Sequence, residues 1–277
     1  MYDFSLVVPT LGRTDELKRL FNSLTEQESV SIELLIIDQN EDDRVVPVLR
    51  ELGSGITVRH IRQTQKNVSM ARNAGLSEAT GSIIAFPDDD CWYPPQLLPR
   101  IAGWFAKKPE YDILSVGAVD DAGLPSGNRW IQSNCRIRPY NSLRTTFCNS
   151  LFIVRKAIPR KIAFDVDLVL GEETDYILRL MKAGCRGYLD RSLFVGHPRR
   201  DMLSGNVSQQ RATRYGEGMG KLVRRHSMGA VWCGLLAYEV ARTALVLLRG
   251  DFTSMQFCLA HTRGLITGFV EGVPIEP

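Results

Sequence analysis

The 277-residue sequence lacks several patterns that identify particular protein classes. Its six cysteines form no CxxC pair, so neither a thiolate metal site nor a disulfide framework is indicated, and reduced thiols in the cytoplasm are expected. The N-terminus has no charged segment followed by an apolar run, so no secretory signal is expected. GxGxxG is absent, which argues against a nicotinamide or flavin enzyme.

The sequence also lacks a strong charge of either sign. Its net charge of +3 is too small to favour nucleic acid as a partner. The basic residues are unevenly distributed, however, because they cluster in residues 199–225.

The first hundred residues alternate between strand and helix patterns, which predicts a parallel sheet. Strands are expected at residues 4–9, 32–38, 56–61 and 83–86. Between them, helices are indicated by the apolar spacing of residues 17–24 after Thr14 as N-cap, by residues 45–52, and by residues 69–79. Further strands are expected at residues 113–119 and 146–154, a helix at 172–183, two short strands near Tyr188 and Val195, and helices from Ser208 onward. We therefore predict an α/β Rossmann-like domain at residues 1–205 and a helical C-terminal segment at 206–277.

An acidic cluster, Asp88, Asp89 and Asp90, directly follows a strand in this pattern. Adjacent carboxylates repel one another unless a cation lies between them, and hard oxygen ligands suit Mg²⁺ or Mn²⁺. A solvated acidic turn is the simpler alternative. The preceding buried strand favours a metal site, because ligands of parallel sheets bind at the carboxyl ends of the strands.

Other motifs accompany the cluster in a defined order. They are residues 5–10 (SLVVPT) with Arg13, residues 34–38 (LLIID), Asn67 with residues 71–75 (ARNAG), and residues 171–175 (GEETD) before Leu178, Arg179 and Leu180. In this order and spacing the chain resembles a family 2 glycosyltransferase over about residues 4–200. The resemblance implies a GT-A fold, an inverting hexosyltransferase, a nucleoside-diphosphate sugar donor, and Mn²⁺ or Mg²⁺ as cofactor.

The resemblance also implies roles for individual residues. Asp38 lies where the family places an aspartate against the donor's base, and Asp88 with Asp90 resembles the DxD metal motif. The expected donor-binding residues are Pro9, Thr10, Arg13, Asp38, Asn67, Arg72, Asn73, Asp88 and Asp89.

Residues 171–175 resemble the family's Gly-Glu-Asp-x-Asp motif on the acceptor side, which supplies the general base. Glu173 stands where the family usually has aspartate, and glutamate can do the same work with a longer reach. Glu172 and Asp175 are the other candidates for the base. Alternatively, all three carboxylates only stabilise a helix N-terminus, where negative charge is favoured.

His197 follows an apolar run, and the resemblance suggests a contact with the metal or the diphosphate, since imidazole ligates divalent ions. The expected metal ligands are therefore Asp88, Asp90 and His197. A structural histidine at a strand end is the alternative. Arg13 and Arg72 can bind phosphate through the guanidinium fork, or they are ordinary surface arginines.

The C-terminal segment places a basic stretch, residues 211–225, before an apolar one, residues 228–248. This order suits an anionic membrane surface, and Glu239 and Arg242 argue against a spanning helix. Packing on the catalytic domain or a homodimer contact is the alternative. We expect a cytoplasmic protein, in contact with the inner face of the membrane if the segment binds lipid.

The acceptor is expected to be a growing surface polysaccharide or another glycan, with a lipid-linked glycan as one form. Two other functions fit parts of the pattern. A nucleotidyltransferase also uses a strand-end carboxylate and Mg²⁺, but its Gly- and Arg-rich phosphate loop is only faintly matched by Leu11, Gly12 and Arg13. A non-catalytic sugar-nucleotide-binding subunit needs no general base, so the acidic motif at residues 172–175 counts against it.

Overall fold

The computed structural model describes residues 2–52, 56–126, 133–143, 150–168, 170–198 and 209–272. The chain forms two compact units: a sheet unit, Met1–Val166 with Tyr176–Arg199, and a helical unit, Asp167–Asp175 with Arg200–Pro277. Each of these units consists of two separate segments of the sequence, whereas the sequence predicts a single domain boundary near residue 205.

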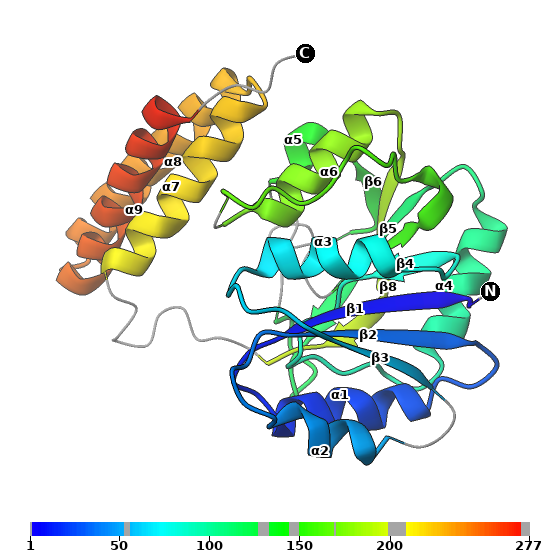
Figure 1. The fold of residues 1–277 in the computed structure, drawn as a ribbon. Coiled ribbons are helices and arrows are strands. Elements are labelled where there is room, and N and C mark those ends of the chain that lie inside the picture. Colours follow the sequence, from blue (N-terminus) through cyan, green and yellow to red (C-terminus); the bar gives the residue numbers. More distant parts are fainter. Residues whose placement is uncertain are drawn as a thin grey trace. The chain divides into compact units, whose positions relative to one another are not determined.

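The sheet unit contains an eight-stranded mixed sheet in the order β3-β2-β1-β4-β7-β5-β8-β6 (Figure 1). Strands β1 to β4 are mutually parallel, β7 runs antiparallel to both of its neighbours, β5 and β8 are parallel, and β6 is antiparallel to β8. The strands are β1 (Phe4–Thr10), β2 (Ile32–Asp38), β3 (Thr57–Arg62), β4 (Ile83–Ala85), β5 (Ile113–Val119), β6 (Cys135–Ile137), β7 (Leu151–Val154) and β8 (Gly187–Gly196).

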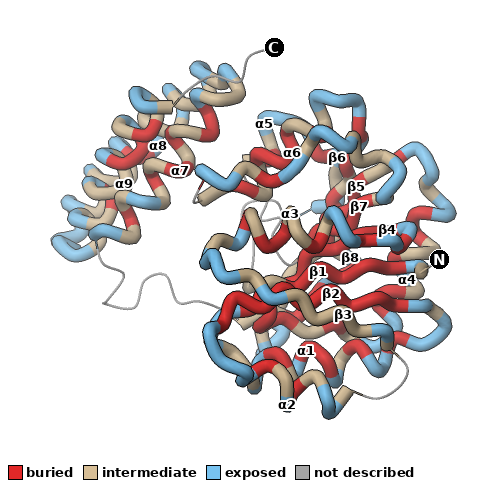
Figure 2. The backbone as a smooth tube through the Cα atoms, in the orientation of Figure 1, coloured by how far each residue is buried: buried red, intermediate tan, exposed pale blue. Residues whose placement is uncertain are grey.

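Helices cover both faces of this sheet, as its buried residues show (Figure 2). One face packs against α1 (Asp15–Thr25), α2 (Val45–Arg50) and α4 (Leu97–Lys107). The other packs against α3 (Val68–Glu78) and the later turns of α6 (Glu172–Lys182). The short α5 (Pro139–Ser142) follows β6, and a 3₁₀ turn, Arg155–Ala157, follows β7. Two covered faces explain why β2 is buried throughout.

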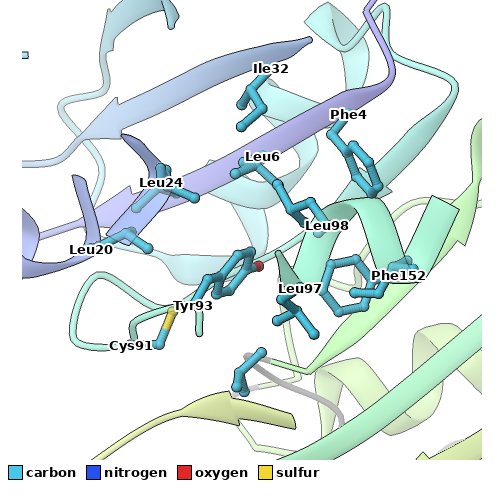
Figure 3. Close-up of a cluster of buried hydrophobic side chains, with 14 of the residues drawn as sticks. Phe4, Leu6, Leu20, Leu24, Ile32, Cys91, Tyr93, Leu97, Leu98 and Phe152 are labelled. Atoms are coloured by element: carbon cyan, nitrogen blue, oxygen red, sulfur yellow. The ribbon is translucent and has the colours of Figure 1, made fainter. Parts of the chain in front are cut away.

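The first face shows how alternating side chains build the core (Figure 3). Phe4 and Leu6 point from β1 to the same side, because successive strand residues face opposite ways. Leu20 and Leu24 of α1 lie one helical turn apart and meet this face. The buried Tyr93 lies just after the acidic cluster and packs in this core, so it holds the chain at the C-terminal end of the cluster.

The α/β class with a helical C-terminal segment is confirmed, and one local prediction needs correction. The two short strands expected near Tyr188 and Val195 are one strand, β8, whose register against β5 shifts after Val116. A bulge of this kind breaks the alternation from which strand ends are inferred. Thr14 occupies the N-cap of α1, as predicted, although its side chain makes no capping hydrogen bond. Of the strand expected at residues 146–154, residues 146–149 lie outside the described residues.

The helical unit contains α7 (Gln209–Arg225), α8 (Gly229–Leu248) and α9 (Phe252–Glu271). Helices α7 and α9 pack backbone to backbone through glycines. A Cβ added at Gly216 would lie 2.1 Å from the carbonyl oxygen of His261, and one at Gly264 would lie 2.1 Å from that of Thr213. Only glycine permits this approach, so the two helices form one rigid pair.

Candidate active site

The carboxyl ends of β1 and β2 lie side by side, with Thr10 paired in register with Asp38. Strand β4 pairs with β1 from Phe4 to Leu6, so the chain after β4 also emerges at this edge. Asp89 accepts a hydrogen bond of 2.8 Å from the Thr10 hydroxyl. Residues separated by almost eighty positions therefore meet at the edge where ligands of parallel sheets bind.

Asp89 and Arg13 tie the loop after β1 to the acidic cluster. The Arg13 guanidinium forms an ion pair with Asp89 and a second, at 3.0 Å, with Asp90. Burial raises the pKa of Asp89, whereas Arg13 and the Thr10 hydroxyl act in the opposite direction. The Arg13 fork is thus engaged by carboxylates, and the loop that carries it is fixed against the cluster.

Asp88, Asp90 and His197 form a cluster that is suited to a metal ion. One ligand atom from each side chain lies within 4.8 Å of the other two. The His197 Nε2 atom is 3.4 Å from Asp90 Oδ1 and 3.8 Å from Asp88 Oδ2. Two carboxylates and an imidazole are ligands that Mn²⁺ accepts. In the part of the chain that the structure describes, no other group of three or more His, Cys, Asp or Glu side chains has ligand atoms this close together.

His197 reaches this cluster because β8 ends there. Its backbone N–H donates to the carbonyl of Val119 at 2.8 Å. Just before it, Gly196 and Trp92 exchange backbone hydrogen bonds of 3.0 and 2.7 Å. A Cβ at Gly196 would lie 1.9 Å from the Trp92 ring, so glycine is required. The Arg19 guanidinium lies 3.3 Å from the centre of that ring, so it covers one face of this aromatic.

Arg72 approaches the cluster from α3. Its side chain is 2% exposed, and Nη2 lies 3.5 Å from Asp88 Oδ1. The guanidinium carbon is 5.5 Å from the centre of the Phe164 ring. Arg72 is therefore not an ordinary surface arginine, because a buried arginine needs charged or polar partners.

Asp38 is fully buried at the end of β2. Its Oδ1 accepts hydrogen bonds of 2.9 and 2.7 Å from the backbone and side-chain nitrogens of Asn40. Its Oδ2 lies 2.8 Å from His60 Nε2 and 3.4 Å from Arg62 Nε. Asn40 also accepts from the Gly12 backbone at 2.7 Å, which links the loops after β1 and β2. These partners hold the carboxylate in one orientation.

Asn67 and Asn73 hold the backbone around α3. Asn67 is the N-cap, because its side chain accepts from the Met70 N–H at 3.0 Å. The Asn73 side chain donates to the Phe164 carbonyl at 2.8 Å and accepts from the Phe164 N–H at 2.7 Å. Both amides bind backbone, and Asn73 supports, through Phe164, the ring beside Arg72. Pro9 lies within β1.

The acidic motif opens α6 and belongs to the helical unit. Asp175 is fully buried, with His226 Nε2 3.0 Å and Arg225 Nε 3.3 Å from its Oδ1. Glu172 is buried, whereas Glu173 is half-buried. The three carboxylates therefore differ: Asp175 is held by two side chains from the end of α7, and Glu173 is the most accessible.

Several partners were not predicted from the sequence, namely His60 and Arg62 beside Asp38, and Arg225 and His226 beside Asp175. His60 and Arg62 lie on the same side of β3, and sequence shows that they meet Asp38 only when the neighbouring strand is known. Arg225 was assigned to a membrane-binding basic stretch. An Arg-His pair at the end of a helix was the available signal for an acidic partner.

A family model for glycosyl transferase family 2 matches residues 5–162. Among curated proteins, the chain is 29% identical over 99 residues to a dolichol-phosphate mannosyltransferase of Pyrococcus furiosus, covering 35% of this chain and 28% of that protein. It is 27% identical over 114 residues to a PGL/p-HBAD biosynthesis glycosyltransferase of Mycobacterium tuberculosis, covering 40% and 44%. These matches span less than half of either relative.

Two solved structures share the fold over nearly the whole chain. The mannosyltransferase PcManGT of Pyrobaculum calidifontis, in complex with GDP-Man and Mn²⁺, has a TM-score of 0.65 at 16% identity, covering 96% of this chain and 87% of that one. S. aureus TarS 1–349 has a TM-score of 0.62 at 12% identity, covering 96% and 90%. The GT-A fold predicted from the motifs is thereby confirmed. Because the family model covers more than half of the sequence, from β1 beyond the acidic cluster and β7, the chain belongs to glycosyl transferase family 2.

Proposed function

We propose that the protein transfers a hexosyl group from a nucleoside-diphosphate sugar to an acceptor hydroxyl, with inversion at the anomeric carbon. The cluster of Asp88, Asp90 and His197 at the carboxyl edge of the sheet carries this proposal. PcManGT, a structural neighbour, was solved with a nucleotide sugar and Mn²⁺. The same donor class and Mn²⁺ or Mg²⁺ as cofactor are proposed here.

Asp88, Asp90 and His197 would hold the cation, and their two carboxylates and imidazole are ligand types that fit it. When bound, the cation neutralises negative charge on the departing nucleoside diphosphate. Arg72 places a positive charge beside Asp88, where it balances the carboxylates and faces a diphosphate. Asp38, oriented by Asn40 and His60, is assigned to the nucleoside. Pro9 and Thr10 line the same edge, while Asn67 and Asn73 support it from α3.

Glu173 is the proposed general base, with Glu172 and Asp175 as the alternatives. It removes the proton from the acceptor hydroxyl as that oxygen attacks the anomeric carbon. Asp175 suits the task least, because it is fully buried and its carboxylate is already engaged by Arg225 and His226. A single displacement of this kind inverts the configuration.

The acceptor is proposed to be a growing surface polysaccharide or another glycan, and a cytoplasmic reaction is proposed. The relative from Mycobacterium tuberculosis is named for PGL/p-HBAD biosynthesis. Cys135, Cys185, Cys233 and Cys258 are free thiols, which suits a reducing compartment. A homodimer through the C-terminal helices also remains a proposal.

Calorimetry with nucleoside diphosphates tests the metal site. Binding is expected in Mn²⁺ and is expected to be lost in EDTA. Asp88→Ala is the cleaner variant, because the Asp88 side chain is 26% exposed, whereas Asp90 is buried and paired with Arg13. Asp88→Ala should weaken binding at least 10-fold, while Asp121→Ala, at a 67% exposed side chain, should not. Equal affinity with EDTA and with Mn²⁺ would show that no cation takes part.

Glu173→Gln separates binding from chemistry, because it keeps the shape of the side chain and removes the proton acceptor. Transfer should fall by about two to four orders of magnitude. Nucleoside-diphosphate affinity should stay within 2-fold of the unchanged protein by the same calorimetry. If transfer is unchanged, the base is Glu172 or Asp175 instead.

A further inference from the structure

Helix α8 has an unusual surface for a helix in water. An 18-residue stretch of this 20-residue helix has a mean hydropathy of 1.6, which makes it long and apolar enough to cross a membrane by length and composition, yet only 6% of that stretch is buried. Large apolar side chains on it are strongly exposed, among them Val240 at 59% and Leu248 at 85%. An amphipathic helix of a soluble unit would turn this surface inward.

The charged side chains of α8 point the opposite way. Glu239 is 5% exposed, and its Oε1 lies 3.5 Å from Arg242 Nη1 and 3.5 Å from His261 Nδ1 of α9. Burial lowers the pKa of His261 below 6.5, although Glu239 acts in the opposite direction. Polar groups inside and apolar groups outside is the arrangement of helices that face lipid.

The face opposite Glu239 contains only uncharged residues. At 100° per residue, the positions most nearly opposite are Ala230, Gly234, Ala237, Ala241, Ala244 and Leu248, and all of them are exposed. Tyr238, Val240, Leu245 and Leu247 border this stripe and are also exposed. The outward face of α8 is therefore a continuous apolar strip about 30 Å long.

The charge of the helical segment favours lipid over a second copy of the chain. Residues 209–272 contain eight arginines and lysines and four acidic residues, which gives +4, and the rest of the chain is −1 because the total is +3. Two copies would bring together two segments of like charge. An anionic bilayer surface instead attracts each basic residue near it by about 1 kcal/mol.

The sequence of α9 indicates whether α8 lies on the membrane or spans it. Only residues 249–251 separate α8 from α9, so a spanning α8 would bring α9 into the bilayer as well. Arg263 lies near the middle of α9 and is exposed. An arginine at the centre of a bilayer costs about 2.5–3.5 kcal/mol or more. An orientation along the interface avoids this cost, because Arg263 can then reach the headgroups.

We infer that the outward face of α8 docks on an anionic lipid bilayer and lies along its interface, with the Glu239–Arg242–His261 cluster turned away from the lipid. This position would bring the enzyme to an acceptor in the membrane, which would narrow the proposed acceptor to a lipid-linked one. Only that last step depends on the proposed function. Lipid binding itself does not, because it needs neither donor nor acceptor.

The test is cosedimentation of the full chain with vesicles of phosphatidylcholine and phosphatidylglycerol. Most of the protein is expected in the pellet at low salt, with less bound as salt rises, and less with phosphatidylcholine alone. Ala241→Glu adds a charge at the centre of the apolar strip and removes no packing, since Ala241 is exposed. It should reduce vesicle partitioning at least 10-fold, while Ala241→Leu should increase it.

Ala106→Glu is the matched control, because Ala106 is an exposed helical alanine in the sheet unit. It should bind vesicles like the unchanged chain. Calorimetry with nucleoside diphosphate and Mn²⁺ on the same variants reports the proposed function separately. The inference is overturned if the full chain stays in the supernatant at low salt, or if Ala241→Glu binds as well as Ala106→Glu. It is also overturned if the chain sediments as a dimer without vesicles and Ala241→Glu dissociates that dimer.

Discussion

Two neighbouring aspartates after β4 have different environments, although sequence shows them as equivalent. Asp89 is held by Thr10 and Arg13, whereas Asp90 pairs with Arg13 and also lies 3.4 Å from His197. The backbone turn after β4 decides which carboxylate faces which partner. The position of the acidic cluster was predictable from the strand before it, but the separate contacts of its members were not, because they depend on residues distant in sequence.

Asp89→Asn tests the difference at this site. Loss of the charged hydrogen bonds to Arg13 and Thr10 at a buried position should lower the free energy of unfolding by about 1–3 kcal/mol. Asp121→Asn, which alters an exposed ion pair with Arg19, should change it by about 1 kcal/mol or less. Urea unfolding of both variants measures this. Equal stabilities would mean that Asp89 has no role in fixing the loop.

His226 is expected to act as a positioning residue for the acidic turn of α6. His226→Ala removes one partner of Asp175, so the turn loses a restraint, and transfer should fall by up to about 100-fold. His226→Gln retains a donor and should restore most of the rate. Arg214→Ala, at an exposed position on α7, is the control.

Nucleoside-diphosphate affinity should not change in any of these three variants, because the proposed donor site lies in the sheet unit. A loss of donor affinity in His226→Ala equal to its loss of transfer would point to general unfolding instead.

At the scale of elements, local periodicity explains why the first four strands and three helices were predictable. Apolar runs such as β2 and the spacing of Leu17, Leu20 and Leu24 in α1 are local signals. Strand β7 was harder, because its antiparallel place between β4 and β5 depends on pairing across the sheet. The inverted polarity of α8 was also not predictable, since a sequence shows the presence of Glu239 but not its direction.

Glu33 lies in β2, which is buried throughout. Apart from Glu33 and the terminal Asp38, every residue of this strand is apolar. Its carboxylate accepts hydrogen bonds from Ser5, from Thr80 and, at 2.9 Å, from the Gly81 N–H. Burial raises its pKa, but these hydrogen bonds together lower it by more, so the pKa in the folded state lies below its ordinary value of 4.5. The unfolded state therefore binds this proton more readily, and the associated stability is present above about pH 4.5 and lost as pH falls through the folded-state pKa.

Glu33→Gln should consequently lower the free energy of unfolding by about 1–3 kcal/mol at pH 7. The variant should then lose less stability than the unchanged protein between pH 5 and pH 3. Urea unfolding across this range measures both effects. Glu26→Gln, at an exposed position after α1, is the control and should keep the original pH dependence. An unchanged acid slope in Glu33→Gln would show that Glu33 does not contribute to it.

At the scale of the whole molecule, the proposed chemistry is divided between two units. The proposed donor and metal residues lie in the sheet unit, while Glu172, Glu173 and Asp175 belong to the helical unit with α7. The sequence suggested a catalytic domain followed by a separate tail, because chain order was the only guide. Ion pairs from Arg225 and His226 to Asp175 connect the C-terminal helices to the acidic motif within the helical unit. We therefore expect these helices to support the proposed general base as well as the proposed membrane contact.

A chain ending at Ser208 tests this division. It retains Asp38, Asp88, Asp90 and His197 but loses the α7 partners of Asp175. Nucleoside-diphosphate binding in Mn²⁺ should stay within about 3-fold, which also shows that the sheet unit has folded, since ligand binding requires the native state. Transfer should fall by about 100-fold or more because the acidic turn is no longer held. Transfer at the full rate would mean that α7 to α9 contribute nothing to the general base, and that their only role is at the membrane.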